Sequence, residues 1–281
     1  MTSFLLKLTI TPALIGLASL VGRRWGTQIS GWLIGLPFTS GPVTFFLALS
    51  HGNSFAAAAA SGTLTGVASE VAFCLSFAWG GWLLTGVRDM RHLRRLGWLL
   101  ALLGGLAGFA LATFVLQGIS APLWAYVALA VVSLGAGLLL MPRARKPSAI
   151  GHAKGPTAPA LPWWDLPARM GLATIFVVAL TAIAPALGPR LTGLLAPFPL
   201  YASILAAFAY QQQGANAALG VLRGLVLGLF GFAAFFLILA TLLVPLGIAL
   251  SFALATLAAL SMQGVTLLLM RRPVVWGADW R

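Results

Sequence analysis

The sequence predicts an all-α, polytopic integral membrane protein with about nine transmembrane helices, in two inverted four-helix repeats joined by a connecting helix. Three observations predict this fold. Of the 281 residues, 60% are hydrophobic and 7% are charged, whereas a soluble domain carries roughly a quarter of charged residues. Long apolar runs follow one another along the chain, and glycines and prolines of the first half recur in the second half at a constant offset.

The apolar runs define the predicted spans, because a helix needs about 20 apolar residues to cross the hydrocarbon core. Nine runs meet this requirement, at residues 4–22, 31–50, 54–79, 97–117, 121–142, 170–187, 193–212, 215–244 and 247–270. The first run could be mistaken for a signal peptide, but no small-x-small cleavage site follows it, so we expect a span. The polar stretch 143–169 is rich in Pro, Gly, Ser and charge and is predicted to be a linker.

The charge distribution predicts the orientation. The chain has 17 Lys and Arg against 4 Asp and Glu, a formal charge of +13, which in a soluble protein would suggest nucleic acid. Here 14 of the 17 basic residues fall in four alternate gaps, after the first, third, fifth and ninth runs. The positive-inside rule places these gaps in the cytoplasm, with the N-terminus outside and the C-terminus cytoplasmic. We therefore expect the lipid bilayer as a partner and no nucleic acid.

An internal repeat appears when the sequence is compared with itself at an offset of 162. In one ungapped register, Gly26, Gly31, Pro37, Gly52, Gly62 and Gly66 correspond to Gly188, Gly193, Pro199, Gly214, Gly224 and Gly228. The alternative is coincidence among 32 glycines. The offset equals five spans, an odd number, so the second copy enters the membrane from the opposite side. The predicted units are repeat 1 (residues 1–118, spans 1–4), span 5 with the linker (119–169), and repeat 2 (170–281, spans 6–9).

The starts of the second and seventh runs are candidates for a substrate path. Both are rich in proline, which removes a backbone donor and clashes with the preceding turn, and both carry hydroxyl groups. The candidate path residues are Pro37, Thr39, Ser40 and Pro42 in the first half and Pro199, Tyr201 and Ser203 in the second. One interpretation is a pair of discontinuous helices lining a cavity. The other is that each proline occupies the first turn of an ordinary helix.

Small residues on the third and eighth runs predict close helix packing. Gly62 and Gly66 have Gly224 and Gly228 as their counterparts, and four-residue spacing of glycines lets helices approach closely in lipid. We expect these two spans to cross at the axis that relates the repeats. This packing role is the one we assign to the four glycines.

Glu70 is the only acidic residue inside a predicted span, and Arg223 is the only basic residue well inside one. An unpaired carboxylate in hydrocarbon costs several kcal/mol, so such residues are protonated or paired. We therefore predict a Glu70–Arg223 pair, or a Glu70 that titrates as a proton-coupling group. The alternative is that Arg223 extends to the cytoplasmic interface and Glu70 lies near the end of its span.

The remaining chemistry of the sequence is sparse. Cys74 is the single cysteine and excludes a disulfide framework. With three histidines and one acid in the membrane, neither a metal site nor a hydrolase centre is expected. We predict that the protein is not an enzyme and has no cofactor.

The runs Gly31-Trp-Leu-Ile-Gly-Leu-Pro-Phe and Gly193-Leu-Leu-Ala-Pro-Phe-Pro-Leu, each followed by a turn glycine and an Ala/Gly-rich helix, resemble the GlpM-like small bacterial inner-membrane proteins. The chain looks like two such four-span units fused in opposite orientations. The resemblance covers mainly the Gly/Pro segment of each half. It implies a bacterial inner membrane and an envelope-related role, and no catalytic residue transfers.

These observations favour a secondary transporter or exporter of a small molecule that works by alternating access, with proton coupling through Glu70 as an addition. Two alternatives stay open: a flippase for a lipid-linked envelope precursor, and a non-transporting scaffold of an envelope complex. The sequence also leaves a homodimer open. A polar cavity at Thr39, Ser40, Tyr201 and Glu70 would favour transport, an opening toward lipid would favour flipping, and neither would favour a scaffold.

Overall fold

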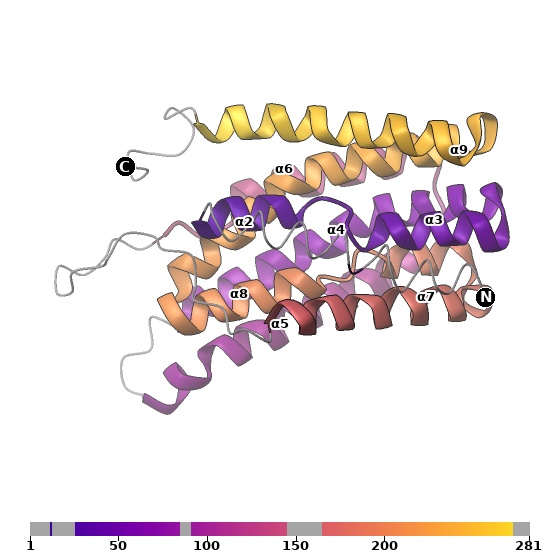
Figure 1. Ribbon diagram of the computed structural model, residues 1–281. Helices are drawn as coiled ribbons and strands as arrows, with labels where there is room; N and C mark the ends of the chain where they lie inside the picture. Colours follow the sequence, from indigo (N-terminus) through magenta and orange to yellow (C-terminus); the bar gives the residue numbers. More distant parts are fainter. Residues whose placement is uncertain (1–11, 13–25, 85–90, 145–164, 272–281) are drawn as a thin grey trace.

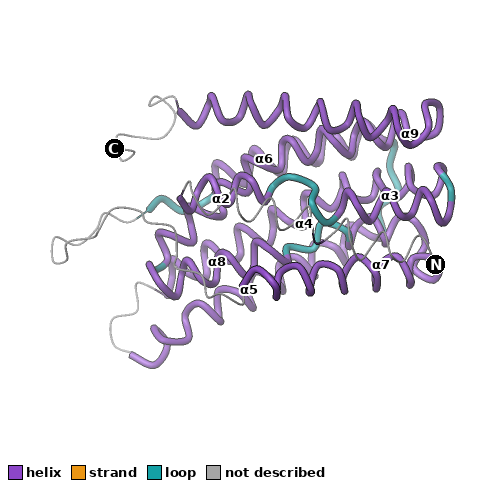
Figure 2. Tube along the Cα trace, viewed as in Figure 1, coloured by secondary structure: helices purple, strands orange, loops and turns teal. Residues whose placement is uncertain are grey.

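The computed structural model of the chain describes residues 12, 26–84, 91–144 and 165–271 (Figure 1). Within these residues every regular element is a helix, and no strand is present (Figure 2). The helices are α2 (Gly26–Ile34), α3 (Ser40–His51), α4 (Asn53–Leu84), α5 (Arg91–Gln117), α6 (Leu123–Leu140), α7 (Asp165–Leu195), α8 (Leu200–Gln213) and α9 (Ala215–Arg271). The all-helical prediction is confirmed for the described part of the chain, and the predicted run 4–22 lies outside it except for residue 12.

Five of these helices, α4, α5, α6, α7 and α9, are long and apolar enough to cross a membrane. Their outward surfaces are apolar as well. Phe114 on α5 is 70% exposed, and Leu139 on α6 is 86% exposed. Large apolar side chains on the outside are what a lipid-facing surface requires, and a soluble protein rarely exposes them as one continuous patch. The apolar helices and their exposed apolar side chains therefore indicate a membrane protein.

Helix α9 consists of two antiparallel arms. Its 57 residues would extend for about 85 Å as one rod, far beyond the roughly 30 Å of a bilayer core. Gly247 interrupts it with φ 72° and ψ −179°, and the second arm returns beside the first (Figure 1). Across this turn the Ser251 hydroxyl donates to the Leu242 carbonyl oxygen at 2.8 Å. The predicted runs 215–244 and 247–270 correspond to these two arms.

Two of the predicted runs are interrupted where their prolines cluster. Residues 35–39 separate α2 from α3, and residues 196–199 separate α7 from α8. Pro37 lies in the first break, and Pro199 immediately precedes α8 in the second. Pro42 instead lies in the first turn of α3, where a missing backbone donor has no cost. Gly188 also interrupts α7, with φ 74° and ψ 164°, so that a short helical segment, residues 189–195, precedes the second break as the short helix α2 precedes the first.

Glycine contacts at the centre of the bundle recur with a constant shift in residue number. A Cβ added to Gly31 would collide with the Val221 carbonyl oxygen, and one added to Gly193 would collide with the Ala59 carbonyl oxygen. Adding 162 to Gly31 and Ala59 gives Gly193 and Val221. Each contact is therefore the counterpart of the other, with the two halves of the chain exchanged. Only glycine fits at either position, because backbone cannot yield to a new side chain.

A second set of contacts follows the same rule. A Cβ on Gly228 would collide with the Trp32 carbonyl oxygen, and a Cβ on Gly66 would lie 3.1 Å from the Leu194 carbonyl oxygen. Gly62 would likewise meet the Arg190 carbonyl oxygen at 2.5 Å. The packing role predicted for these glycines is therefore seen, but their partners differ from the prediction: they face the short helix of the other half. Gly224 is buried.

The turn glycines also match in geometry. Gly52 joins α3 to α4 with φ 85° and ψ 166°, and Gly214 joins α8 to α9 with φ 90° and ψ −179°. This conformation is reserved for glycine. The two turns lie at opposite ends of the bundle, the α3–α4 turn at the right of Figure 1 and the α8–α9 turn at the left. Helices α4 and α9 therefore start from opposite ends, and both pack against each other in the core.

Candidate functional site

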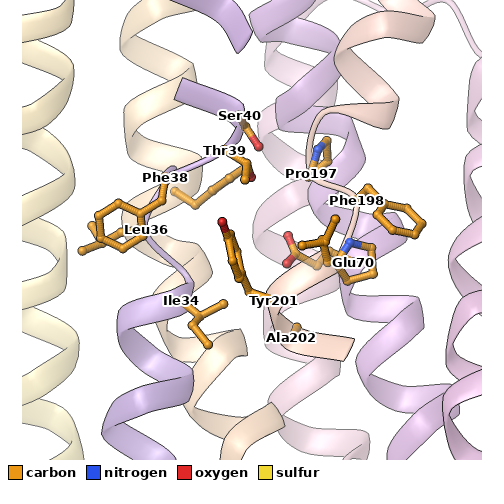
Figure 3. Close-up of a pocket in the computed structure, with 13 residues that line it drawn as sticks. Ile34, Leu36, Phe38, Thr39, Ser40, Glu70, Pro197, Phe198, Tyr201 and Ala202 are labelled. Atoms are coloured by element: carbon orange, nitrogen blue, oxygen red, sulfur yellow. The ribbon is translucent and has the colours of Figure 1, made fainter. Parts of the chain in front are cut away.

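The two breaks meet at a single cavity between the halves of the chain. It is lined by Ile34, Leu36, Phe38, Thr39 and Ser40 from the first break, by Pro197, Phe198, Pro199, Leu200, Tyr201 and Ala202 from the second, and by Glu70 of α4 and Phe232 of α9 (Figure 3). The centre of a water-sized molecule can occupy about 20 Å³ of it, which is room for about one water. In this conformation the cavity is therefore nearly closed.

The lining is built from positions that correspond in the two halves. Five pairs of lining residues are separated by 162: Leu36 with Phe198, Phe38 with Leu200, Thr39 with Tyr201, Ser40 with Ala202, and Glu70 with Phe232. Ten of the thirteen lining residues belong to these pairs. The offset of 162 residues that relates the glycine contacts of the two halves therefore also relates most of the residues that line the cavity.

A hydrogen bond joins the two breaks directly. The Ser40 hydroxyl donates to the Ala196 carbonyl oxygen at 2.8 Å, and Ser40 itself is buried. The counterpart of Ser40 is Ala202, which has no hydroxyl, so this bond has no equivalent on the other side. Ser40 also accepts at its backbone oxygen from the Thr44 hydroxyl at 3.1 Å, one turn further along α3.

Glu70 is the charged group of the cavity. Its side chain is 6% exposed, and its carboxylate points toward the side where Tyr201 lies (Figure 3). The Oε2 atom has no hydrogen-bond partner among the described residues. A buried polar atom without a partner is costly and marks a place where a proton, an ion or a ligand would be stabilising.

The structure does not bring Glu70 and Arg223 together. Arg223 is half-buried on α9. Its Nη2 donates at 2.9 Å to the carbonyl oxygen of Pro142, which lies just after the C-terminus of α6. The predicted pair fails for a geometric reason. The glycines of α4 and α9 pack against the short helices rather than against each other, so equal depth on the two helices does not place these side chains in contact.

The predicted path residues divide into two groups. Thr39, Ser40, Pro199 and Tyr201 line the cavity, whereas Pro37, Pro42 and Ser203 do not. The Ser203 hydroxyl is buried without a hydrogen-bond partner among the described residues. The Tyr201 hydroxyl donates to the Arg169 backbone oxygen at 3.5 Å, the long limit of a hydrogen bond.

The sequence analysis missed the aromatic and aliphatic part of the lining. Phe38, Phe198 and Phe232 all face the cavity. Phe232 could have been found, because adding 162 to Glu70 gives its number. Phe38 and Phe198 lie beside the prolines of the two breaks, but an apolar residue in an apolar chain carries no signal of its own.

No family model, curated protein or solved structure matches the chain. Its function is therefore inferred from the site itself.

Proposed function

We propose that the protein is a secondary transporter of a small molecule, which works by alternating access between two inverted repeats of a bacterial inner-membrane protein. The single observation that carries the proposal is the cavity at Thr39, Ser40, Tyr201 and Glu70, formed where two interrupted helices meet. Non-helical backbone at membrane depth is tolerated only where protein buries it or where it lines a cavity. Substrate sites of transporters with inverted repeats are built in this way.

The inversion is supported by the glycine contacts and the turns. The contacts Gly31–Val221 and Gly193–Ala59 exchange when 162 is added or subtracted, and the turns at Gly52 and Gly214 lie at opposite ends of the bundle. We infer two repeats of four spans, nine spans in all, with the broken runs as spans 2 and 7. The distribution of basic residues supports an external N-terminus and a cytoplasmic C-terminus.

Labelling from each face of the membrane tests the proposal without knowledge of the substrate. In a Cys74→Ala background, Thr39→Cys and Tyr201→Cys are placed in the cavity, and Ala130→Cys is the matched control because Ala130 is 1% exposed and does not line it. A membrane-impermeant maleimide is applied to right-side-out and to inverted vesicles. Alternating access requires that both cavity positions react from both faces while the control reacts from neither.

Other outcomes of the same labelling contradict transport and separate the alternatives. Reaction of the cavity positions only with a lipid-soluble maleimide would indicate an opening toward the bilayer, as a flippase needs. Reaction with neither reagent would indicate a closed, packed interior, as a scaffold needs. Reaction from one face alone would indicate a static site.

A further inference from the structure

Two helix N-termini converge on the cavity. Helix α3 has 12 residues and begins at Ser40, and helix α8 has 14 residues and begins at Leu200. Thr39 and Ser40 at the first start and Tyr201 and Ala202 at the second all line the cavity. The first amides of a helix have no acceptor within it, and each N-terminus acts as roughly half a positive charge. Together they present about one positive charge to the cavity.

The helix C-termini at the same breaks do not cancel this charge fully, because their carbonyl oxygens are engaged. The Leu33 oxygen accepts from the Leu36 amide at 3.1 Å, and the Leu195 oxygen accepts from the Phe198 amide at 3.0 Å. The Ala196 oxygen accepts from Ser40. Of the amides at the two helix starts, those of Gly41 and Ser203 donate to the Pro37 and Pro199 oxygens at 2.9 and 2.8 Å, whereas those of Ser40, Tyr201 and Ala202 have no backbone acceptor among the described residues.

Glu70 supplies the opposite charge. Its carboxylate is 94% buried, reaches the cavity and leaves Oε2 without a partner among the described residues. The polar groups around it come from several helices: Tyr201 of α8, Thr39 and Ser40 of α3, and Cys74 one turn along α4. Phe232 of α9 adds no charge. Arg169 of α7 is buried, and its positive charge lies close enough to act on Tyr201. Arg223 of α9 is bonded to Pro142.

An ionised Glu70 and an anionic ligand would compete for the same two helix starts. With Glu70 ionised, its charge of −1 offsets the roughly +1 of the N-termini, and a second anion would be repelled. With Glu70 protonated, the positive ends are left without a counter-charge. The cavity also has apolar lining residues, among them Ile34, Leu36, Phe198 and Phe232. Because this conformation has room for about one water, a ligand with a short chain binds only when these side chains move apart.

We propose that the cavity binds a small organic monoanion, a carboxylate with a short apolar tail, and that Glu70 takes up one proton each time the anion binds. The carboxylate is held at the starts of α3 and α8, and the tail packs among the phenylalanines. In terms of the proposed transport function, on which this inference rests, the protein is then a symporter of a monocarboxylate with a proton.

Binding to the purified full-length protein in detergent tests the inference directly. The probes are radiolabelled pyruvate and butyrate, with ethylammonium as a cation of similar size and malonate as a dianion. Equilibrium dialysis measures the affinity, and a weakly buffered solution reports proton uptake. We expect the affinity for the monocarboxylates to fall by about tenfold per pH unit once Glu70 ionises, with one proton taken up per anion bound.

The Glu70→Gln variant sharpens the test, because glutamine imitates the protonated carboxyl. We expect it to bind the monocarboxylates equally at every pH and without proton uptake. Ser61→Ala on the same helix is the matched control, since the Ser61 hydroxyl bonds only to the Ala57 oxygen of its own helix and does not line the cavity. It should behave as the wild-type protein. Proton uptake by the wild-type protein decides the matter even if the Glu70 variant does not fold.

Several results would overturn the inference. Loss of monocarboxylate binding in a folded Glu70→Gln variant, absence of binding of either monocarboxylate to the wild-type protein, or binding of ethylammonium with release of a proton would each do so. Equal binding of malonate would also contradict a monoanion site. If the cavity positions are labelled from both faces but monocarboxylates do not bind, the proposed transport function stands and the monocarboxylate site is rejected. If monocarboxylates bind but labelling occurs from one face only, the site stands and the transport function is rejected.

Discussion

The two halves of the molecule share their backbone contacts but differ in the chemistry that they bring to the cavity. Gly31 and Gly193 meet carbonyl oxygens at corresponding positions of the other half, and the turns at Gly52 and Gly214 have the same unusual geometry. At the cavity the first half contributes Ser40 and Glu70, and the second half contributes Ala202 and Phe232 at the same places. The backbone contacts and turns are thus present in both halves, whereas Ser40 and Glu70 are polar groups of the first half that have apolar counterparts in the second.

The largest expected effect concerns the shared frame. Gly31→Ala and Gly193→Ala each force a methyl group into a backbone carbonyl oxygen, and overpacking of this kind typically costs about 1–3 kcal/mol or more. We expect both variants to lose most of their thermal stability in detergent, by similar amounts. Gly135→Ala and Gly264→Ala are the controls, because a Cβ there meets nothing within 4 Å. A large loss at Gly31 with none at Gly193 would break the equivalence of the halves.

The second prediction concerns the turns. Gly52→Ala and Gly214→Ala meet no neighbouring atom, so their cost comes only from backbone strain at positive φ. Such strain amounts to about 1–3 kcal/mol, and we expect both unfolding midpoints to fall by comparable amounts. Thermal unfolding followed by circular dichroism measures this effect. Midpoints equal to that of Gly135→Ala would show that the turns do not hold this geometry in the membrane protein.

The third prediction addresses a difference between the halves. Ser40→Ala removes the side-chain hydrogen bond that joins the two breaks, at a cost of about 1 kcal/mol. Thr44→Ala is the control, since its hydroxyl bonds within α3. We expect faster labelling of Thr39→Cys in the Ser40→Ala background and no change in the Thr44→Ala background. Unchanged labelling in both would mean that this bond does not hold the breaks together.

The smallest expected effect concerns Arg223. Its guanidinium bonds to the Pro142 oxygen and not to Glu70, so Arg223→Gln should have no effect on the titration of Glu70. The pH dependence of monocarboxylate binding should stay as in the wild-type protein. The contrary result would be a shift of that pH dependence in Arg223→Gln that disappears in the double variant with Glu70→Gln. It would support the predicted Glu70–Arg223 ion pair.

The sequence was sufficient to predict the helical class, the interrupted helices and part of the cavity. Prolines and glycines carry local information, because they restrict or extend the backbone angles at their own positions. They therefore located the breaks, and with them Thr39, Ser40 and Tyr201. Gly62 and Gly66 correctly indicated a close approach of another segment but did not identify that segment. A helix face made of glycines can pack against the backbone of any neighbouring segment.

Contacts between distant segments were harder to predict. The Glu70–Arg223 pair was inferred from equal depth on two helices assumed to cross at their glycines. Those glycines contact other segments, and the Arg223 guanidinium bonds to the Pro142 oxygen. Phe232 and Phe198 could not be distinguished from other apolar residues, because hydropathy in a membrane chain does not separate a lipid-facing side chain from one that lines a cavity. The numerical offset of 162 was the one long-range signal available, and applied to Glu70 it would have given Phe232.

The glycine contacts at Gly31 and Gly193 also limit how the molecule can move. A rearrangement that makes each half adopt the shape of the other must preserve any feature that is already the same in both. These two contacts satisfy that condition. They can therefore stay fixed and act as a pivot while the other helices of the two halves move. The Ser40–Ala196 bond does not satisfy it, because Ala202 cannot form its mirror image. This hydrogen bond therefore stabilises one of the two end conformations of the transport cycle and has no equivalent in the other. The two conformations would then be unequally populated.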